Sequence, residues 1–260
     1  MRTSKSLSVF LTLMMVVPFL LHAQDDNKYP MYWVHEDKVM PSMQADYEKV
    51  AKMLTDKCTE FNVDIPGWIT TSSIDARYLY VTPIKSLGDI ANANAGFGDL
   101  REKMGAEAFD QMFADMNKCY TAHGDYVITM DKELTYMPDG ITQTPEGEDY
   151  RKFYYLHSTP SKIGKLRKKM MAIKELYQSK GSKSSYRVYR SGFGTMGDFY
   201  MVAIASKDAV SFEVNGAAND KLLGEDAKPL FAEVMKYVTK MEEVTGAMRP
   251  DLAYTPNISN

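Results

Sequence analysis

Apolar residues recur along the chain with two periods, one typical of helices and the other of strands. In residues 42–61 and again in 161–179 they return every three or four positions, which predicts two amphipathic helices that pack on a core. Short runs rich in β-branched and aromatic residues flank both helices and predict strands. These runs are 31–35, 67–74 and 77–84 in the first half and 153–157, 185–192 and 198–205 in the second.

A stretch of 26 residues near the end of the chain repeats an earlier one without a gap. "FADMNKCYTAHGDYVITMDKELTYMP" (113–138) and "FAEVMKYVTKMEEVTGAMRPDLAYTP" (231–256) share eight identical positions at an offset of 118 residues. That offset matches a small domain and is far too long for a solenoid unit. Each stretch predicts a second helix and then a last strand, "KELTYMP" or "PDLAYTP". Segments rich in Gly, Asn and Ala, at 85–105 and 206–224, predict loops before these helices.

Each half therefore has the predicted order β-α-β-β-α-β, which is that of a ferredoxin-like unit. We expect an α+β protein in which residues 24–138 and 150–260 form two tandem ferredoxin-like units, joined by the polar linker 139–149. The predicted strands are apolar on both faces, so helices on one face of each sheet leave the other face uncovered. Packing sheet to sheet would cover it and give a single-chain α/β barrel.

This element order and the repeat resemble the dimeric α/β-barrel superfamily, which includes NIPSNAP-like proteins, antibiotic-biosynthesis monooxygenases and stress-responsive barrel proteins. The resemblance covers most of residues 29–256 and rests on element order, not on a diagnostic motif. It implies a barrel of two ferredoxin-like units whose interior can hold a ligand. It also implies one enzymatic function, a monooxygenase-like reaction that proceeds without a metal or with haem.

The N-terminal residues have the pattern of a secretory signal peptide. Arg2 and Lys5 precede the apolar run "LSVFLTLMMVVPFLLHA", which ends at Ala23. We expect removal of residues 1–23 and export to the periplasm or the exterior, with no integral membrane segment afterwards. Loss of Arg2 and Lys5 moves the formal net charge from −3 to −5. This acidic balance argues against a nucleic-acid partner.

Two cysteines remain in the predicted mature chain. Cys58 and Cys119 both continue the apolar faces of predicted helices, which indicates buried free thiols rather than a disulfide. His123 follows Cys119 by four residues on the same predicted helix. We interpret this pair as a core cysteine and a helix-end histidine, not as an activated nucleophile.

The strongest candidates for a site are His35 and His157, which recur where the first strand of each half is predicted to end. Trp33 and Tyr155 stand two residues before them, so each shares a strand face with its histidine. Both pairs could line one pocket between the two sheets, where the imidazoles would bind a metal, ligate haem or move protons. The alternative is that they are inherited repeat positions that only pack and hydrogen-bond nearby backbone.

The sequence leaves the function open between three classes. The first is an exported barrel that binds a small apolar or aromatic ligand, with His35, His157, Trp33 and Tyr155 at the ligand. The second is the monooxygenase-like enzyme, cofactor-free or haem-dependent, and the third is a non-catalytic interaction protein of the cell envelope. No metal site is predicted, because no third ligand is evident from the spacing, and the sequence identifies no cofactor.

Overall fold

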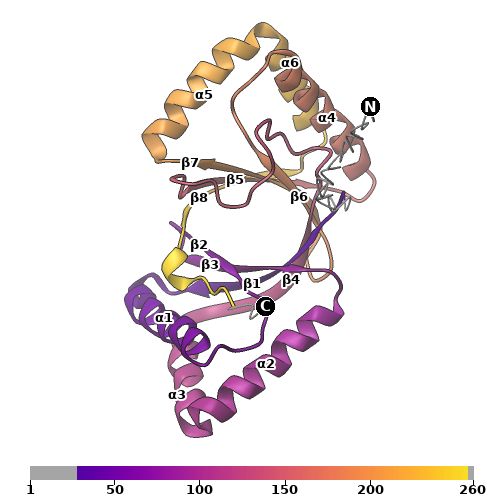
Figure 1. Ribbon diagram of the computed structural model, residues 1–260. Coiled ribbons are helices and arrows are strands. Elements are labelled where there is room, and N and C mark those ends of the chain that lie inside the picture. The colour runs from indigo at the N-terminus through magenta and orange to yellow at the C-terminus, as the bar shows by residue number, and fades with distance from the viewer. Residues whose placement is uncertain (1–27, 257–260) are drawn as a thin grey trace, which may run out of the picture.

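Residues 28–256, which the computed structural model describes, form a closed barrel of eight strands with helices on its outside (Figure 1). All strand pairs are antiparallel, in the ring order β1-β3-β2-β8-β5-β7-β6-β4. The strands are β1 (Met31–Val39), β2 (Ile69–Ser73), β3 (Arg77–Ile84), β4 (Tyr120–Met130), β5 (Tyr150–Ser158), β6 (Arg187–Ser191), β7 (Asp198–Ser206) and β8 (Lys240–Met248). The predicted signal peptide lies outside the described residues. Within 28–256 no helix is long and apolar enough to cross a membrane.

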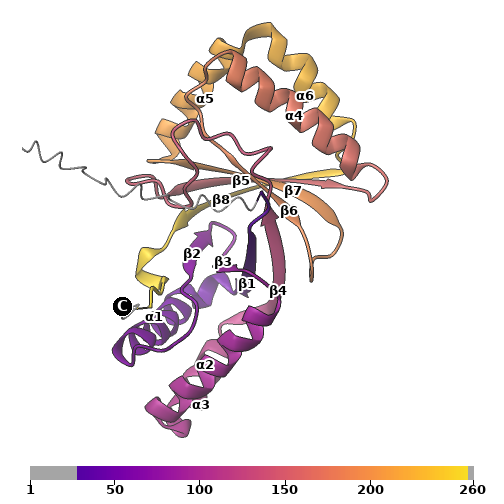
Figure 2. The ribbon, with the colours of Figure 1, turned by 45° about the vertical axis from the view of Figure 1, so that its right-hand side comes forward.

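The helices form two groups on opposite sides of the barrel, as both ribbon views show (Figures 1 and 2). The first half supplies α1 (Gln44–Glu60), α2 (Gly88–Met104) and α3 (Ala106–Asn117), and the second supplies α4 (Ile163–Ser179), α5 (Ala209–Leu223) and α6 (Ala227–Met235). Strands β1–β4 are neighbours, as are β5–β8, and the two groups join edge to edge where β2 pairs with β8 and β4 with β6. The prediction of an α+β barrel is confirmed. The two sheets are not separate layers stacked face to face, because their edges hydrogen-bond into one closed ring, which leaves no unpaired edge.

The prediction of loops at 85–105 and 206–224 is wrong, because these segments form α2 and α5. In α2 the residues Ala93, Phe97 and Leu100 recur at helical spacing and face the core, which outweighs the Gly and Asn content. Helix α5 begins at a capping aspartate: Asp208 accepts a hydrogen bond of 2.7 Å from the backbone N–H of Ser211. Both helices carry enough alanine, the best helix former, to offset the helix breakers.

The cysteine prediction agrees with the structure. Cys58 on α1 and Cys119 just after α3 are both buried and free. Burial raises the pKa of Cys58 to about 12, so its thiol stays protonated and unreactive at neutral pH.

The last strand of each half was also predicted at the wrong position, too late in the sequence. The repeated stretch contains β4 or β8 before the segments "KELTYMP" and "PDLAYTP", which are tails that follow the strand. Each tail makes one isolated bridge with the residue that precedes a strand of the other half. Tyr136 pairs with Tyr186 ahead of β6, and Tyr254 pairs with Trp68 ahead of β2.

These tails are exchanged between the halves. Leu134, after β4, is buried against α4 and α6 of the second half, in a core cluster with Leu166 and Val234. Leu252, after β8, is buried against α1 of the first half, in the cluster around Tyr47. The identical Leu and Tyr positions of the repeat are therefore the residues that fasten each half to the other.

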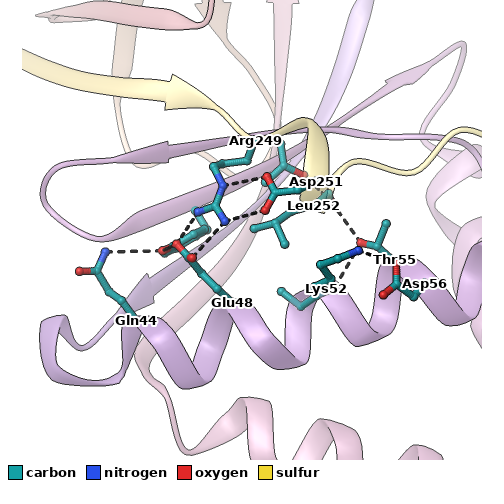
Figure 3. Close-up of polar contacts among 11 residues, drawn as sticks. Gln44, Glu48, Lys52, Thr55, Asp56, Arg249, Asp251 and Leu252 are labelled. Atoms are coloured by element: carbon teal, nitrogen blue, oxygen red, sulfur yellow. Dashed lines mark hydrogen bonds and ion pairs between the residues drawn. The ribbon is translucent and has the colours of Figure 1, made fainter.

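The C-terminal tail is held on α1 by a dense set of polar contacts (Figure 3). Arg249 makes two hydrogen bonds to the Glu48 carboxylate and two to Asp251, with Nε 2.9 Å from Asp251 Oδ1. The Leu252 carbonyl accepts from Thr55 Oγ1 at 3.3 Å, Thr70 Oγ1 at 2.8 Å and Trp68 Nε1 at 2.9 Å. Arginine forks of this kind fix orientation as well as position.

The barrel interior is mostly filled by side chains, which leave a cavity of about 50 Å³. Arg151 and Arg187 are buried at one end and donate to backbone carbonyls of the linker, including Thr142 O at 2.7 Å from Arg187 Nη1. Burial, with the charge of Arg187, lowers the pKa of Arg151 to about 10. Backbone carbonyls thus take the place of the carboxylate that a buried arginine would otherwise require.

The exchanged tail generates a stability prediction. Leu252→Ala should lower the free energy of unfolding by about 2–5 kcal/mol, because it leaves a cavity at a fully buried position. The matched control is Leu222→Ala on α5, where the leucine is exposed. Urea unfolding followed by circular dichroism measures both variants, and equal losses would contradict the anchoring role of the tail.

Candidate functional site

A cavity of about 390 Å³ lies between the outer face of the first-half strands and helices α1, α2 and α3. Its walls are mainly apolar and aromatic, and one end is polar. The lining residues are Trp33, His35, Asp37, Leu54, Ile65, Pro66, Trp68, Tyr80, Thr82, Ala93, Phe97, Phe109, Phe113, Met116 and Asp125. An apolar hollow with a few convergent polar groups is the usual composition of a small-molecule site.

The polar end is built from two His-x-Asp segments on paired strands. Residues 35–37 of β1 read "HED" and residues 123–125 of β4 read "HGD". Antiparallel pairing sets His35 opposite Asp125 and Asp37 opposite His123. Residues two apart on a strand share a face, so all four side chains belong to the same outer face.

Short contacts tie these groups together. His35 Nδ1 lies 3.0 Å from Asp125 Oδ1, which also accepts the Trp33 indole N–H at 2.8 Å. His35 Nε2 lies 3.3 Å from Asp37 Oδ1. Beneath them, the Tyr47 hydroxyl donates to Asp37 Oδ2 at 2.5 Å.

The Asp37 carboxylate is the most deeply placed charge of the group, with 2 % of its side chain exposed against 31 % for His35. Its Oδ1 makes no hydrogen bond of good geometry within residues 28–256 and is contacted there by His35 Nε2 at 3.3 Å. Neither Asp37 nor Asp125 has a lysine or arginine within 4.0 Å in that part of the chain. His35 is therefore their neighbouring cationic group.

The two carboxylates control the protonation of His35. Burial alone would lower the pKa of this imidazole, but Asp125 and Asp37 outweigh that effect and raise the pKa to about 9. In turn, His35 lowers the pKa of Asp125 below its usual range. At neutral pH the cluster thus holds an imidazolium between two carboxylates at the end of an apolar cavity.

The structure does not bring the four predicted site residues together. Trp33 and His35 line the outer cavity, whereas Tyr155 lines the barrel interior and His157 shares its face of β5. The expectation that both histidines flank one pocket is wrong. Whether any of the four contacts a ligand stays a prediction.

The error comes from the alignment of the two first strands. At the 118-residue offset of the repeat, Asp125 matches Glu243, and the strand registers pair Asp125 with His35 and Glu243 with Tyr154. The counterpart of His35 is therefore Tyr154 and not His157. Tyr154 and His157 are three residues apart. Because side chains alternate between the two faces of a strand, a shift by an odd number of residues moves a side chain to the opposite face.

His157 has the surroundings of a packed residue. Its ring lies 5.6 Å from Phe199 and 6.4 Å from Tyr155, and its Nε2 is buried without a hydrogen-bond partner in the described residues. Burial, with the charge of Lys240, lowers its pKa. Of the two candidate histidines, only His35 has carboxylate partners.

Sequence reasoning missed Asp37, Asp125 and His123. His123 was assigned to a helix end, but it lies on β4, where its ring stacks on Tyr120 at 5.1 Å and meets the His35 ring edge-on at 5.6 Å. The two His-x-Asp segments were visible in the sequence. They carry a signal only when both lie on strands, because only then do their side chains share a face.

A second cavity, of about 340 Å³, occupies the equivalent place under the second-half helices. It is lined by residues such as Leu156, Met170 and Phe231, with no histidine, cysteine or carboxylate among its lining residues in the described chain. Each half thus has a hollow between its strands and its helices, and among the described residues only the hollow of the first half is lined by histidine and carboxylate side chains.

Comparisons with known proteins agree with the architecture. An anthrone oxidase-like protein of known structure matches 86 % of this chain and 92 % of its own, with a TM-score of 0.58 and 16 % identity. A "putative monooxygenase" from Lactobacillus acidophilus matches 88 % of this chain and 97 % of its own, with a TM-score of 0.51 and 10 % identity. A variant of chlorite dismutase from Candidatus Nitrospira defluvii matches 85 % of this chain and 92 % of its own, with a TM-score of 0.51 and 11 % identity. The sequence matches no protein-family model and no curated protein.

These structures share the fold of this chain, a closed eight-stranded barrel of the α+β class. In this chain both groups of four strands belong to one polypeptide. Identities this low establish the fold and leave chemistry to the site itself.

The cavity under the first-half helices does not suit haem. Among the described residues, no lysine or arginine lines this cavity, so haem propionates would have no cationic partner there. A single metal ion is different, because His35, Asp37 and His123 offer ligand atoms that all lie within 4.8 Å of one another.

The paired carboxylates generate a prediction for NMR. In chelator-treated protein at pH 7.5, His35 should be protonated and His157 neutral, as read from their ring nitrogen shifts. Asp125→Asn should bring the pKa of His35 down toward its ordinary value of 6.5. A neutral His35 at pH 7.5 would contradict the ion-pair geometry.

The raised pKa of His35 also determines how its contribution to stability changes with pH. Because folding raises the pKa of His35, its contribution to stability is fully present below pH 6.5 and is lost as the pH rises through about 9. The difference in unfolding free energy between wild type and His35→Gln should therefore shrink over that interval.

Proposed function

We propose that this protein is a monooxygenase-like enzyme that takes a small aromatic molecule with a hydroxyl or keto oxygen into the first-half cavity. One observation carries the proposal: an apolar, aromatic-walled cavity of about 390 Å³ ends in the His35–Asp37–Asp125 group. The apolar body of such a molecule would lie between Phe97, Phe113 and Trp68. Its oxygen would face His35.

Aromatic side chains from both layers favour a flat ring system over a flexible chain. Trp68 and Tyr80 come from the barrel side of the cavity, with ring centroids 6.4 Å apart. Phe109 and Phe113 come from α3, with centroids 4.7 Å apart. Stacked and edge-on contacts to such rings add to what burial contributes.

His35 supplies the chemistry that an aromatic hydroxyl needs. Once the hydroxyl proton has passed to solvent, the positive charge of the His35 imidazolium would stabilise the deprotonated, electron-rich form of the molecule, and Asp37 and Asp125 hold the ring in place. The neighbouring apolar walls lower the local dielectric constant, which strengthens this interaction. The names of the structural neighbours support oxygenase chemistry as the class of reaction.

We also propose that the protein is exported and that its halves are copies of one ferredoxin-like unit. The pattern of residues 1–23 supports export. The matched strand registers and the reciprocal tails support the duplication. On this view one copy has histidine and carboxylate groups in its cavity, and the cavity of the other copy is lined by apolar residues and tyrosines.

Ligand binding is tested with the protein's own fluorescence. The chain has two tryptophans, Trp33 and Trp68, and both line the first-half cavity. We expect saturable quenching of tryptophan fluorescence by two- and three-ring phenols and ketones, with 1-naphthol as the first probe, and binding confirmed by calorimetry.

A pair of space-filling variants locates the ligand. Leu54→Trp fills the first-half cavity and should weaken binding of 1-naphthol at least tenfold, as measured by calorimetry. Leu156→Trp fills the second-half cavity and should leave affinity within twofold. The reverse pattern, or no binding across the whole panel by wild type, would refute the proposal.

Oxygen uptake distinguishes an enzyme from a binding protein. With a bound phenol, wild type should consume oxygen, and His35→Gln should be slower by about 10²-fold or more, the usual contribution of a group positioned to stabilise a developing anion. His157→Gln serves as the control. Tight binding without oxygen uptake would leave a ligand-binding protein and remove the enzymatic part of the proposal.

A further inference from the structure

We propose that His35, Asp37 and His123 form a binding site for one divalent transition-metal ion, such as Zn²⁺, Fe²⁺ or Co²⁺. The three residues each offer a ligand atom, and these atoms lie within 4.8 Å of one another. The site does not depend on the function proposed above. A His35 that ligates the ion must release its proton, so its role as an imidazolium applies to the metal-free protein.

Strand pairing places the ligands. Asp37 and His123 are directly opposite each other on β1 and β4, and His35 is two residues before Asp37 on the same face. His35 Nε2 and Asp37 Oδ1 are 3.3 Å apart. Ligand atoms about 2.1 Å from a tetrahedral ion are themselves about 3.4 Å apart, so this pair already has the spacing of a shared ion. His123 is exposed and can turn its ring toward them.

A second layer of contacts orients the ligands as metal sites require. Asp125 engages Nδ1 of His35 and leaves Nε2 for the ion, and Trp33 fixes Asp125 in turn. A carboxylate on the other ring nitrogen is the common support of a metal-binding histidine. Tyr47 holds Oδ2 of Asp37, so that Oδ1 is the oxygen directed at the site.

The buried Asp37 oxygen is the independent sign of a cation site. Only 2 % of the Asp37 side chain is exposed, and its Oδ1 makes no hydrogen bond of good geometry within residues 28–256, with His35 Nε2 at 3.3 Å as its one ion-pair contact there. A buried carboxylate oxygen without a donor is costly. A divalent ion would satisfy it and would also neutralise Asp37 and Asp125, which have no lysine or arginine nearby in the described chain.

The ligand set selects the kind of ion. Two imidazoles and one carboxylate suit zinc or iron and disfavour magnesium and calcium, which prefer oxygen ligands. Three protein ligands leave coordination positions open. Because His35 and Asp37 also line the first-half cavity, an open position would lie at its polar end, next to the oxygen of a bound molecule.

The test uses calorimetry with Zn²⁺ on untagged, chelator-treated protein at pH 7.5, without any organic ligand. Wild type should bind one Zn²⁺ per chain. His123→Ala, an exposed position whose loss should not disturb folding, should weaken the affinity at least tenfold, and Asp37→Asn should do so as well. His157→Ala is the matched control and should stay within twofold of wild type. Asp125→Asn should weaken affinity by about 10–100-fold, as loss of a supporting contact does.

Two further measurements make the outcome decisive. Bound Co²⁺ should give a visible absorption spectrum in wild type that His123→Ala lacks. Leu54→Trp, which fills the cavity, should still bind Zn²⁺, so a failure of the proposed ligand site and a failure of the metal site are distinguishable. Absence of Zn²⁺ binding by wild type, or equal affinity in wild type and His123→Ala, would overturn the inference.

Discussion

The exchange of tails between the two halves is the interaction on which the rest of the structure depends. Leu134 and Tyr136 leave the first half and complete the second, and Leu252 and Tyr254 make the reverse connection. Each tail packs against helices that belong to the other half. Together with the β2–β8 and β4–β6 pairs, they close the ring and fix each sheet against its helices.

Closure of the ring sets where chemistry can occur. A strand in a closed barrel has one face inside and one outside, with alternate residues on each. The inside of this barrel is nearly filled, and Arg151 and Arg187 bind the linker across one end. The outer faces meet helices across hollows of about 390 and 340 Å³. The outer face therefore has room for a ligand. In the first half, His35, Asp37 and Asp125 line the hollow on that face.

Much of the fold could be predicted from the sequence because helical periodicity and strand composition are local signals. They identified α1, α4, β3 and β7 closely, whereas the origin of the two halves as tandem copies stays a proposal. The helices α2 and α5 were missed because Gly and Asn suggest loops when the packing partners are unknown. The strands β4 and β8 were placed too late because the Leu and Tyr of the tails alternate as they would in a strand.

The site could not be read from the sequence for a more specific reason. Its geometry depends on strand register, and register is a long-range property that one inserted residue reverses. Matching His35 with His157 was off by three positions, which exchanged inside for outside. Asp125 and His123 became relevant only once β4 was known to pair with β1 in the register that opposes His35 to Asp125.

We propose that the working surface of this barrel is the outer face of its first half. A crystal structure of the protein soaked with 1-naphthol would test this proposal. Electron density is expected between β1, β3 and helices α2 and α3, with the ring near Trp68 and Phe97 and the hydroxyl directed toward His35. Density inside the barrel beside Tyr155 and His157, or under the second-half helices with the first-half cavity empty, would contradict it.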